Sequence, residues 1–505
     1  MTTDGGNWLQ PDQPNLALGM AISGGGLRAA LYALGSTLFL VHSGLNEKVR
    51  LISSVSGGSI LNAILALDGD FTRVDARRFT KLASRLGHRL SKRGVFFFAG
   101  IKRLVISLLT FLLFGPLFLG LMSLIEGTWV GTWEIFWFLE VGYAVPMTFF
   151  LLGFTVFGRK SVQQEAYGQC ILHTLRPWHD KKALRRPQLR QMPESAVTHV
   201  LCATELTSGQ PIYMSREMIL SPRYGRGDDP ELPLQKAIYA SAAFPIGFPP
   251  LRVKSDRMRF AGGVDDMVPT RLVLSDGGVF NNLGTDAFAA DRAPEEIYLP
   301  DPSLAILPDV NQQLIVNASA PPKKWVGSNW PIVRAVTSSA RIMSVLYENT
   351  LTPRIQSLLE DQQREGGPLV VDISESPIRL LERLGQSTKQ DEAERAAEVR
   401  ESLLKTVTRD EWDEYADRAA CTKTVLSPVG RASAVRLVRL GYFGTAAACH
   451  VRFETGGPKT WPTDRWFQDL IDGQVDENQL VPGTANTGVQ SGVGVEVGAE
   501  PVHEH

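Results

Sequence analysis

Ser56 lies in a segment that could supply a nucleophile. The segment SVSGGS stands between an apolar run (VRLIS) and a helical pattern (ILNAILAL). A strand, a sharp turn and a helix around a central serine expose the serine hydroxyl, as a catalytic nucleophile requires. The turn needs small residues two positions before and after the serine. Gly58 meets this need, and Ser54 stands where the usual pattern has glycine. By itself, the segment fits a plain serine-glycine turn equally well.

A glycine turn earlier in the chain could stabilise negative charge. Gly24, Gly25 and Gly26 follow the apolar run LALGMAIS and precede the helical pattern LRAALYALGSTLFL. Such a turn directs free backbone N–H groups at one point, and the helix N-terminus adds positive partial charge. The segment lacks both the GxGxxG spacing of dinucleotide sites and the Gly-Lys-Ser/Thr of P-loops. It indicates a site for a phosphate or a developing oxyanion.

A third segment presents the carboxylate of Asp276. This residue follows the strand-like run RLVL and precedes Gly277 and Gly278, so little steric cover surrounds its side chain. An ordinary Asp-Gly turn has the same pattern. A serine nucleophile also needs a base within hydrogen-bonding reach, and none of the eight histidines lies in a recognisable catalytic context. The combination favours a Ser56–Asp276 dyad over a triad that contains histidine.

The composition excludes several classes of protein. The chain has 505 residues, of which 44% are hydrophobic, and a net charge of −1. It is long enough for two or three structural units, and it lacks the basic excess of nucleic-acid-binding proteins. The four cysteines form no CxxC pair, which argues against a disulfide framework or a zinc site. We therefore expect no nucleic-acid partner, no metal and no cofactor, and a reducing compartment.

Two long apolar stretches predict a membrane hairpin. Leu104–Ile125 contains 22 residues without a charge, and Ile135–Phe157 is interrupted only by Glu140. At about 1.5 Å per residue, the first helix would be about 33 Å long, enough to cross a hydrocarbon core of about 30 Å. The residues between the two stretches include Trp129 and Trp133, which suit a bilayer interface. A hairpin buried in a soluble core, or a second segment that lies in the membrane plane, is the alternative.

Basic residues flank the predicted hairpin on both sides. The connector between the spans carries two glutamates and no Lys or Arg. The positive-inside rule therefore predicts a two-span protein of the inner or plasma membrane, with its catalytic domain and both termini in the cytoplasm. The absence of a secretory signal in residues 1–14 agrees with this orientation. The flanking cations could also attract anionic headgroups or be a topology signal alone; they include Arg85, Arg89, Lys92, Arg93, Lys102, Arg103, Arg159 and Lys160.

The rest of the chain has an α/β pattern. Apolar runs typical of buried strands are Leu16–Ile22, Val49–Val55, His199–Ala203 and Leu314–Ala318. Leu380–Ala420 has the charge and spacing of solvated amphipathic helices. Beyond about Asp472 the composition predicts a disordered tail. We thus expect residues 1–95 and 161–472 to form the two parts of a catalytic domain, with the hairpin at 96–160 and the tail at 473–505.

Taken together, the motifs resemble those of the patatin-like phospholipase family, of the bacterial type with an inserted transmembrane hairpin. GGGLRA is similar to the family's oxyanion-hole motif, SVSGG to its GxSxG elbow and DGGVFNN to its Asp-Gly-Gly/Ala motif. Ala237–Leu251 resembles the segment that precedes the catalytic aspartate, and His199–Tyr213 resembles a hairpin of the family. The resemblance covers roughly residues 15–90 and 160–450. It implies a three-layer α/β sandwich with a central, mostly parallel sheet.

The resemblance also implies a mechanism. Ser56 would attack an acyl ester, Asp276 would accept its proton, and N–H groups of Gly24, Gly25 and Gly26 would hold the oxyanion. The expected function is a membrane-anchored lipid acyl hydrolase of the phospholipase A or lysophospholipase type, acting on membrane phospholipids or other acyl-lipid esters. Arg28 would orient the glycine turn or bind a lipid phosphate, and a surface salt bridge is equally open. An acyltransferase with the same dyad and an inactive membrane scaffold are the alternatives.

Overall fold

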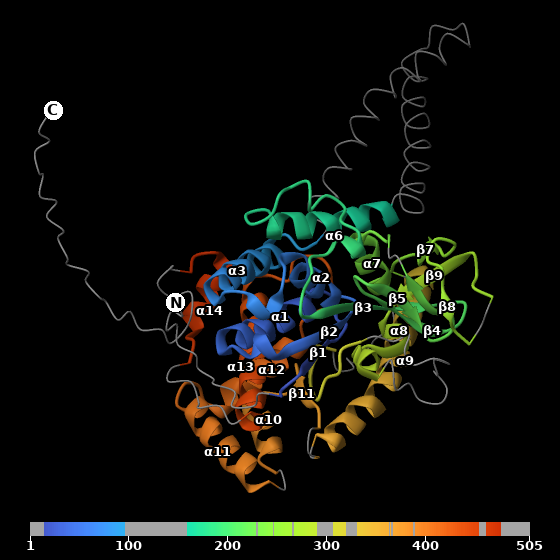
Figure 1. Cartoon of the computed structure of the whole chain (residues 1–505). Helices are drawn as coiled ribbons and strands as arrows, with labels where there is room; N and C mark the ends of the chain where they lie inside the picture. The colour runs from blue at the N-terminus through green and yellow to red at the C-terminus, as the bar shows by residue number, and fades with distance from the viewer. Residues whose placement is uncertain are drawn as a thin grey trace, which may run out of the picture.

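One sheet of eleven strands unites the two predicted parts of the catalytic domain (Figure 1). Along its main path the strand order is β11-β10-β1-β2-β3-β4-β5-β6-β8, and β9 joins β3 to β7. The four strands expected from the sequence are all present, as β1, β2, β3 and β10. The bounds are β1 Leu18–Ile22, β2 Val49–Val55, β3 Thr198–Glu205, β4 Gln210–Met214, β5 Met218–Ser221, β6 Gly225–Asp228, β7 Leu251–Lys254, β8 Ala261–Gly262, β9 Arg271–Asp276, β10 Gln312–Asn317 and β11 Leu369–Asp372.

The structure is a computed structural model that describes residues 15–95, 159–228, 231–245, 247–264, 267–289, 307–319, 331–362, 364, 367–386, 389–453 and 461–475. The predicted hairpin at 96–160 lies outside the described residues except for its last two positions, which begin a helix. The predicted tail also lies outside them from residue 476 onward. Within the described ranges, no helix combines the length and apolar character needed to cross a bilayer.

The sheet is mixed, and the expectation of a mostly parallel sheet applies to only one part of it. The strands β11, β10, β1, β2 and β3 pair in parallel. From β3 onward every pairing is antiparallel, including that of β3 with β9. Connections of only a few residues join β3, β4, β5 and β6. Such short turns permit antiparallel hairpins only, because a parallel pair needs a long crossover.

Alternate residues of the central strands face two separate cores. Met20 and Ile22 of β1 belong to the large core with α1 (Gly26–Ser43) and α13 (Arg431–Arg452), whereas Ala21 faces α9 (Pro331–Asp361) on the other side. This period of two is the signature of a strand that is buried on both faces. The sheet is therefore the middle of three layers, as the resemblance implied.

Helices α1 and α13 approach each other closely at two glycines. A Cβ atom on Gly35 would lie 2.0 Å from the carbonyl oxygen of Val438, and one on Gly441 would lie 2.0 Å from that of Tyr32. Neither position can accept a side chain without moving a backbone. The contact fixes α1, and α1 begins at the glycine turn whose chemistry is considered below.

The charged stretch at Leu380–Ala420 forms helices, as expected, but it is less solvated than its sequence suggested. The Trp412 side chain is fully buried and packs edge-on against Phe443 of α13, with ring centroids 5.0 Å apart. The guanidinium of Arg439 lies 4.6 Å from the centre of the Trp412 ring. The remaining helices are α2 Gly58–Asp68, α3 Ala76–Lys92, α6 Arg159–Leu175, α7 Leu234–Ser241, α8 Gly278–Asn281, α10 Pro377–Leu384, α11 Gln390–Leu404, α12 Arg409–Ala420 and α14 Asp464–Asp472.

Candidate active site

Ser56 lies at a sharp turn between β2 and α2. Its φ angle is +52°, a left-handed conformation that is uncommon for a residue other than glycine. Residues held in this region cluster at functional sites, where the surrounding structure maintains the strain. A Cβ atom on Gly58 would lie 2.6 Å from the Ile22 side chain, so only glycine fits there. Ser54 is accommodated because its hydroxyl bonds to Ser59 Oγ at 3.0 Å and to the Val200 carbonyl at 3.1 Å.

Asp276 meets Ser56 because β2 and β9 lie end to end along the same edge of β3. Strand β2 runs parallel to β3, and its last residue, Val55, pairs with Cys202. Strand β9 runs antiparallel to β3, and its last residue, Asp276, pairs with Ala203. The carboxyl ends of β2 and β9 therefore converge at one point on β3. The structure brings the two predicted residues together there, with the Ser56 hydroxyl near enough to the Asp276 carboxylate to lower the pKa of that carboxylate.

The environment of Asp276 favours its neutral form more than water would. Its side chain is only 2% exposed, and this burial raises its pKa to about 7. Hydrogen bonds from the Gly278 N–H, at 2.8 Å, and from the Ser56 hydroxyl partly offset the burial because they stabilise the charged form. A carboxylate with a pKa near neutrality can both accept and return a proton under physiological conditions.

Ser241, the last residue of α7, holds the two turns in position. Its carbonyl oxygen accepts hydrogen bonds from the N–H of Ser56 at 3.1 Å and from that of Gly277 at 3.2 Å. Its hydroxyl lies 3.0 Å from the Ser56 nitrogen and 2.8 Å from Ser59 Oγ. Ser241 belongs to the segment Ala237–Leu251, which the resemblance singled out without assigning it a role.

The glycine turn packs directly against Ser56. A Cβ atom on Gly24 would lie 3.2 Å from that of Ser56, and one on Gly57 would lie 1.9 Å from the Gly26 carbonyl oxygen. The N–H of Gly24 is already engaged, because it donates to the Asn282 carbonyl at 2.9 Å. This differs from the expectation that all three glycines donate to an oxyanion. Within the described residues, the N–H groups of Gly25, Gly26 and Gly57 have no hydrogen-bond acceptor.

Arg28 is buried beneath the turn. Its side chain is 1% exposed, and it donates from Nε to the Ala318 carbonyl and from Nη1 to the Thr422 carbonyl, each at 2.8 Å. Burial lowers its pKa to about 10, an effect opposed by the charge of Asp372. Of the roles considered, orientation of the glycine turn agrees with these contacts. A surface salt bridge does not, because the side chain lies in the interior.

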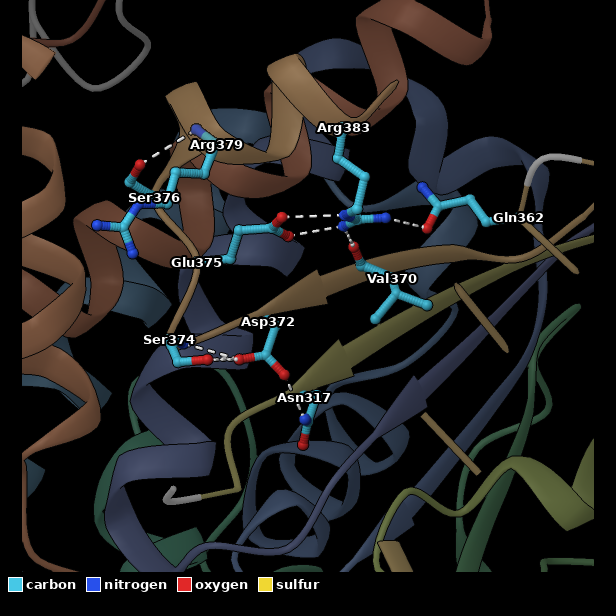
Figure 2. A network of polar contacts seen from close by, with 9 residues as sticks. All are labelled: Asn317, Gln362, Val370, Asp372, Ser374, Glu375, Ser376, Arg379 and Arg383. Atoms are coloured by element: carbon cyan, nitrogen blue, oxygen red, sulfur yellow. Dashed lines mark hydrogen bonds and ion pairs between the residues drawn. The ribbon is translucent and has the colours of Figure 1, made fainter. Parts of the chain in front are cut away.

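Polar contacts at the carboxyl ends of β10 and β11 support the same turn (Figure 2). The Asp372 carboxylate accepts from Asn317 Nδ2 at 2.6 Å and from the N–H of Ser374 at 2.8 Å. Ala318, which follows Asn317, donates its N–H to Ser23 Oγ at 2.7 Å. Figure 2 also shows Arg383 bound to Glu375 through two hydrogen bonds. The network fixes the loop after β10 and, through it, the residue that precedes Gly24.

Two histidines near the core have structural partners. His42 lies 2.9 Å from Thr80 Oγ1, and His199 lies 2.7 Å from Asn62 Oδ1. Burial lowers the pKa of each to about 3. In the part of the chain that the structure describes, no hydrogen bond joins a histidine to Ser56.

Tyr347 of α9 is a neighbour of the dyad that the sequence did not indicate. A Cβ atom on Gly278 would lie 2.5 Å from its ring, and the Phe244 ring lies 5.6 Å away. Its hydroxyl is buried and has no hydrogen-bond partner among the described residues. Burial and the charge of Asp276 raise its pKa well above the usual range. It is thus a neutral donor beside the dyad, on a helix that is remote in sequence and carries no motif.

One protein family matches the part of the chain that contains Ser56 and Asp276. The Patatin family, described as patatin-like phospholipase, matches residues 20–289. No curated protein matches the sequence. Similar solved structures include human GIVD cytosolic phospholipase A2 (12% identity, TM-score 0.38), with 90% of this chain and 63% of that chain covered. They also include VipD from Legionella pneumophila (12% identity, TM-score 0.23), with 92% of this chain and 91% of that chain covered. The chain thus spans less than two thirds of the human enzyme.

The family match extends from β1 to the segment after α8. It contains the glycine turn, the Ser56 turn and the Asp276 turn. It covers more than half of the 505 residues. This protein belongs to the patatin-like phospholipase family.

Proposed function

We propose that the protein hydrolyses acyl esters of lipids, with Ser56 as nucleophile and Asp276 as its base. The observation that carries the proposal is the convergence of the strained Ser56 and the buried Asp276 at one point on β3. An activated serine needs a base beside it and donors for the oxyanion, and the positions of Asp276 and of the glycine turn support these two roles.

The chemistry follows from these positions. Asp276 accepts the hydroxyl proton while Ser56 attacks the ester carbonyl, and the N–H groups of Gly25, Gly26 and Gly57 are placed to hold the oxyanion. The proton then passes from Asp276 to the leaving alkoxide, and an acyl-enzyme remains. Water, deprotonated by Asp276, attacks the acyl-enzyme and releases the fatty acid and a free Ser56.

Family membership and exposed apolar side chains on α9 support a lipid substrate. Ile342 and Leu346 lie one helical turn apart on α9, next to Tyr347, and their side chains are 59% and 52% exposed. Exposed apolar side chains on the helix that carries Tyr347 are compatible with contact to a lipid, which a soluble polar substrate would not need.

Removal of either member of the dyad should abolish hydrolysis. The full-length protein, Ser56→Ala and Asp276→Asn would each be incubated with mixed phospholipid vesicles, and released fatty acids and lysolipids measured by mass spectrometry. We expect each variant to lose activity by about 10³-fold or more, because the nucleophile and its base act as a unit. Ser53→Ala is a matched control, since Ser53 lies on the same strand but bonds to the Gly284 carbonyl.

Equal release by all three proteins would contradict the dyad. If the wild type releases no fatty acid or lysolipid, hydrolysis of phospholipid under these conditions is contradicted. The same assay with an added alcohol acceptor separates hydrolysis from acyl transfer, because transfer yields a new ester in place of the free acid.

The pH dependence of kcat/KM should follow the ionisation of Asp276. The base must be ionised to act, and burial raises its pKa to about 7. We expect kcat/KM to fall about tenfold per pH unit below this value and to level off above it. Initial rates on a water-soluble acyl ester, measured from pH 5 to pH 9, test the expectation. A rate that stays constant down to pH 5 would mean that Asp276 has an ordinary pKa or is not the base.

The Tyr347 hydroxyl should assist the reaction. It is a buried hydroxyl beside Asp276 that has no hydrogen-bond partner among the described residues, and it can donate to an ester oxygen as charge develops there. Tyr347→Phe should therefore lower kcat by about tenfold to a hundredfold and leave the thermal unfolding midpoint within a few degrees of wild type. Wild-type kcat in this variant would show that the ring serves packing alone.

We also propose that the segment at 96–160 anchors the protein in the inner or plasma membrane, with both termini and the catalytic domain in the cytoplasm. The hydropathy and the flanking charges of the sequence support this arrangement. The tight connector would then face the opposite side of the membrane from Cys421, which is exposed on the catalytic domain.

Labelling with a membrane-impermeant maleimide can test this topology. In intact cells, Gly131→Cys should be labelled through the connector, whereas the native Cys421 should react only after lysis. Labelling of Cys421 in intact cells, or protection of the new thiol until lysis, would contradict the orientation. Release of the protein by alkaline carbonate would contradict the anchor itself.

A further inference from the structure

We infer that Ser54 is a positioning residue, which holds the Ser56 turn in place through a chain of buried hydroxyl groups. The inference rests on the proposed role of Ser56 as nucleophile. Ser54 stands where the GxSxG pattern has glycine, and its side chain is fully buried. A hydroxyl in the interior needs hydrogen-bond partners, and those of Ser54 connect it to the backbone of the nucleophile.

Three serine hydroxyls form the chain, which lies on the buried side of the turn. The Ser56 N–H donates to Ser241 Oγ at 3.0 Å. Ser241 Oγ lies 2.8 Å from Ser59 Oγ, and Ser59 Oγ lies 3.0 Å from Ser54 Oγ. Ser54 donates in turn to the Val200 carbonyl at 3.1 Å. The chain therefore connects α7, α2, β2 and β3, and all three of its serines are fully buried.

Among the hydrogen bonds of the described residues, only one direction of the chain gives every hydroxyl an acceptor. The Val200 oxygen can only accept, so the Ser54 hydroxyl donates to it and accepts from Ser59. The Ser241 hydroxyl then donates to Ser59 and accepts from the Ser56 N–H. In the reverse direction the Ser241 proton would have no acceptor in this part of the chain. The direction set at Ser54 thus makes Ser241 Oγ an acceptor for the nucleophile's N–H.

Asn62 of α2 holds Ser54 from a second side. Its Nδ2 donates to Ser54 Oγ at 2.8 Å and to the Val200 carbonyl at 2.9 Å. Its Oδ1 lies 2.7 Å from His199 Nδ1 and can only accept, so Nδ1 carries the ring proton. Burial lowers the pKa of His199 to about 3, and the ring is therefore neutral near pH 7. The end of the chain at Ser54 is thus fixed by groups that do not change charge under physiological conditions.

The chain supports a backbone conformation that needs outside contacts. Ser56 has a φ angle of +52°, and a strained residue keeps such an angle only where its surroundings enforce it. Its N–H is shared between the Ser241 carbonyl, at 3.1 Å, and the Ser241 hydroxyl. If Ser54 or Ser59 loses its hydroxyl, the Ser241 hydroxyl is no longer fixed as an acceptor. The turn can then relax and move the Ser56 oxygen away from its reactive position.

Loss of one hydroxyl should therefore lower kcat without a matching change in KM. For full-length Ser54→Ala and Ser59→Ala we expect kcat on a water-soluble acyl ester to fall about tenfold to a hundredfold, with KM within about twofold of wild type. Ser54→Gly should lose as much, although it restores the residue of the GxSxG pattern, because glycine also lacks the hydroxyl. The double variant of Ser54→Ala and Ser59→Ala should lose no more than the weaker single variant, since either change interrupts the same chain.

Ser84→Ala is the matched control. It removes another buried serine hydroxyl, which donates to the Leu470 carbonyl at 2.7 Å in the contact between α3 and α14. It should lower the thermal unfolding midpoint as the chain variants do and leave kcat and KM at wild-type values. Wild-type kcat in Ser54→Ala, Ser54→Gly or Ser59→Ala would overturn the inference. Losses that multiply in the double variant would also overturn it, because they would show two independent contacts.

Hydrogen–deuterium exchange at the Ser56 turn tests the chain without turnover. Backbone amides in the peptide that contains Ser56 should exchange faster in Ser54→Ala and Ser59→Ala than in wild type and Ser84→Ala, because a less constrained turn opens more often. Equal, negligible turnover by wild type and Ser56→Ala would contradict the proposed function and leave this test in force. Unchanged exchange at the turn in both chain variants would show that the hydroxyls do not hold it.

Discussion

The site depends on the way two strands share one edge of β3. Strand β2 pairs with Thr198–Cys202 and ends there, and β9 continues the same edge from Ala203 to Glu205 in the opposite direction. Only opposite directions bring the two carboxyl ends together, so a fully parallel sheet would place Asp276 at the wrong end of its strand. The Ser241 carbonyl then fixes the junction, because it accepts from both turns. The mixed character of the sheet is thus what brings Ser56 and Asp276 together, as the proposed dyad requires.

A second requirement is the absence of side chains where three turns meet. The glycine turn, the Ser56 turn and the Asp276 turn approach so closely that a Cβ atom on Gly24 would lie 2.2 Å from Asn282 Oδ1, and one on Gly57 would overlap the Gly26 carbonyl. Because the three turns pack so closely, no side chain fits between them. The hydrogen-bond donors that the turns present are therefore backbone N–H groups. These donors are fixed before a substrate arrives, which is the condition for effective oxyanion stabilisation.

Local patterns in the sequence were sufficient to predict the turns and the strands that lead into them. Ser56 and Asp276 were predicted as site residues because each follows an apolar run and precedes glycines, a pattern confined to a few residues. The direction of β9 could not be predicted from the sequence, because it depends on pairing with β3, which is about 70 residues away in the chain. The sequence also could not predict that the Gly24 N–H donates to the Asn282 carbonyl, because that residue is distant in the chain. Tyr347 lies on a helix without a motif, and only the tertiary structure places it beside Asp276.

The basic residues show most clearly why residue type alone does not assign a role. Arg28 follows a phosphate-type turn, yet carbonyl groups of Ala318 and Thr422 occupy two of its nitrogens and its side chain is buried. Arg85 and Arg89 could be explained as a signal for membrane topology, a role that needs no particular geometry. The structure instead places both on one wall of a cavity and gives Arg85 the carbonyl groups of His173 and Thr174 as partners. A buried cation whose donors are taken by backbone carbonyls, as those of Arg28 are, holds distant segments together. Contacts of this kind join residues far apart in the chain, so no short window of the sequence contains them.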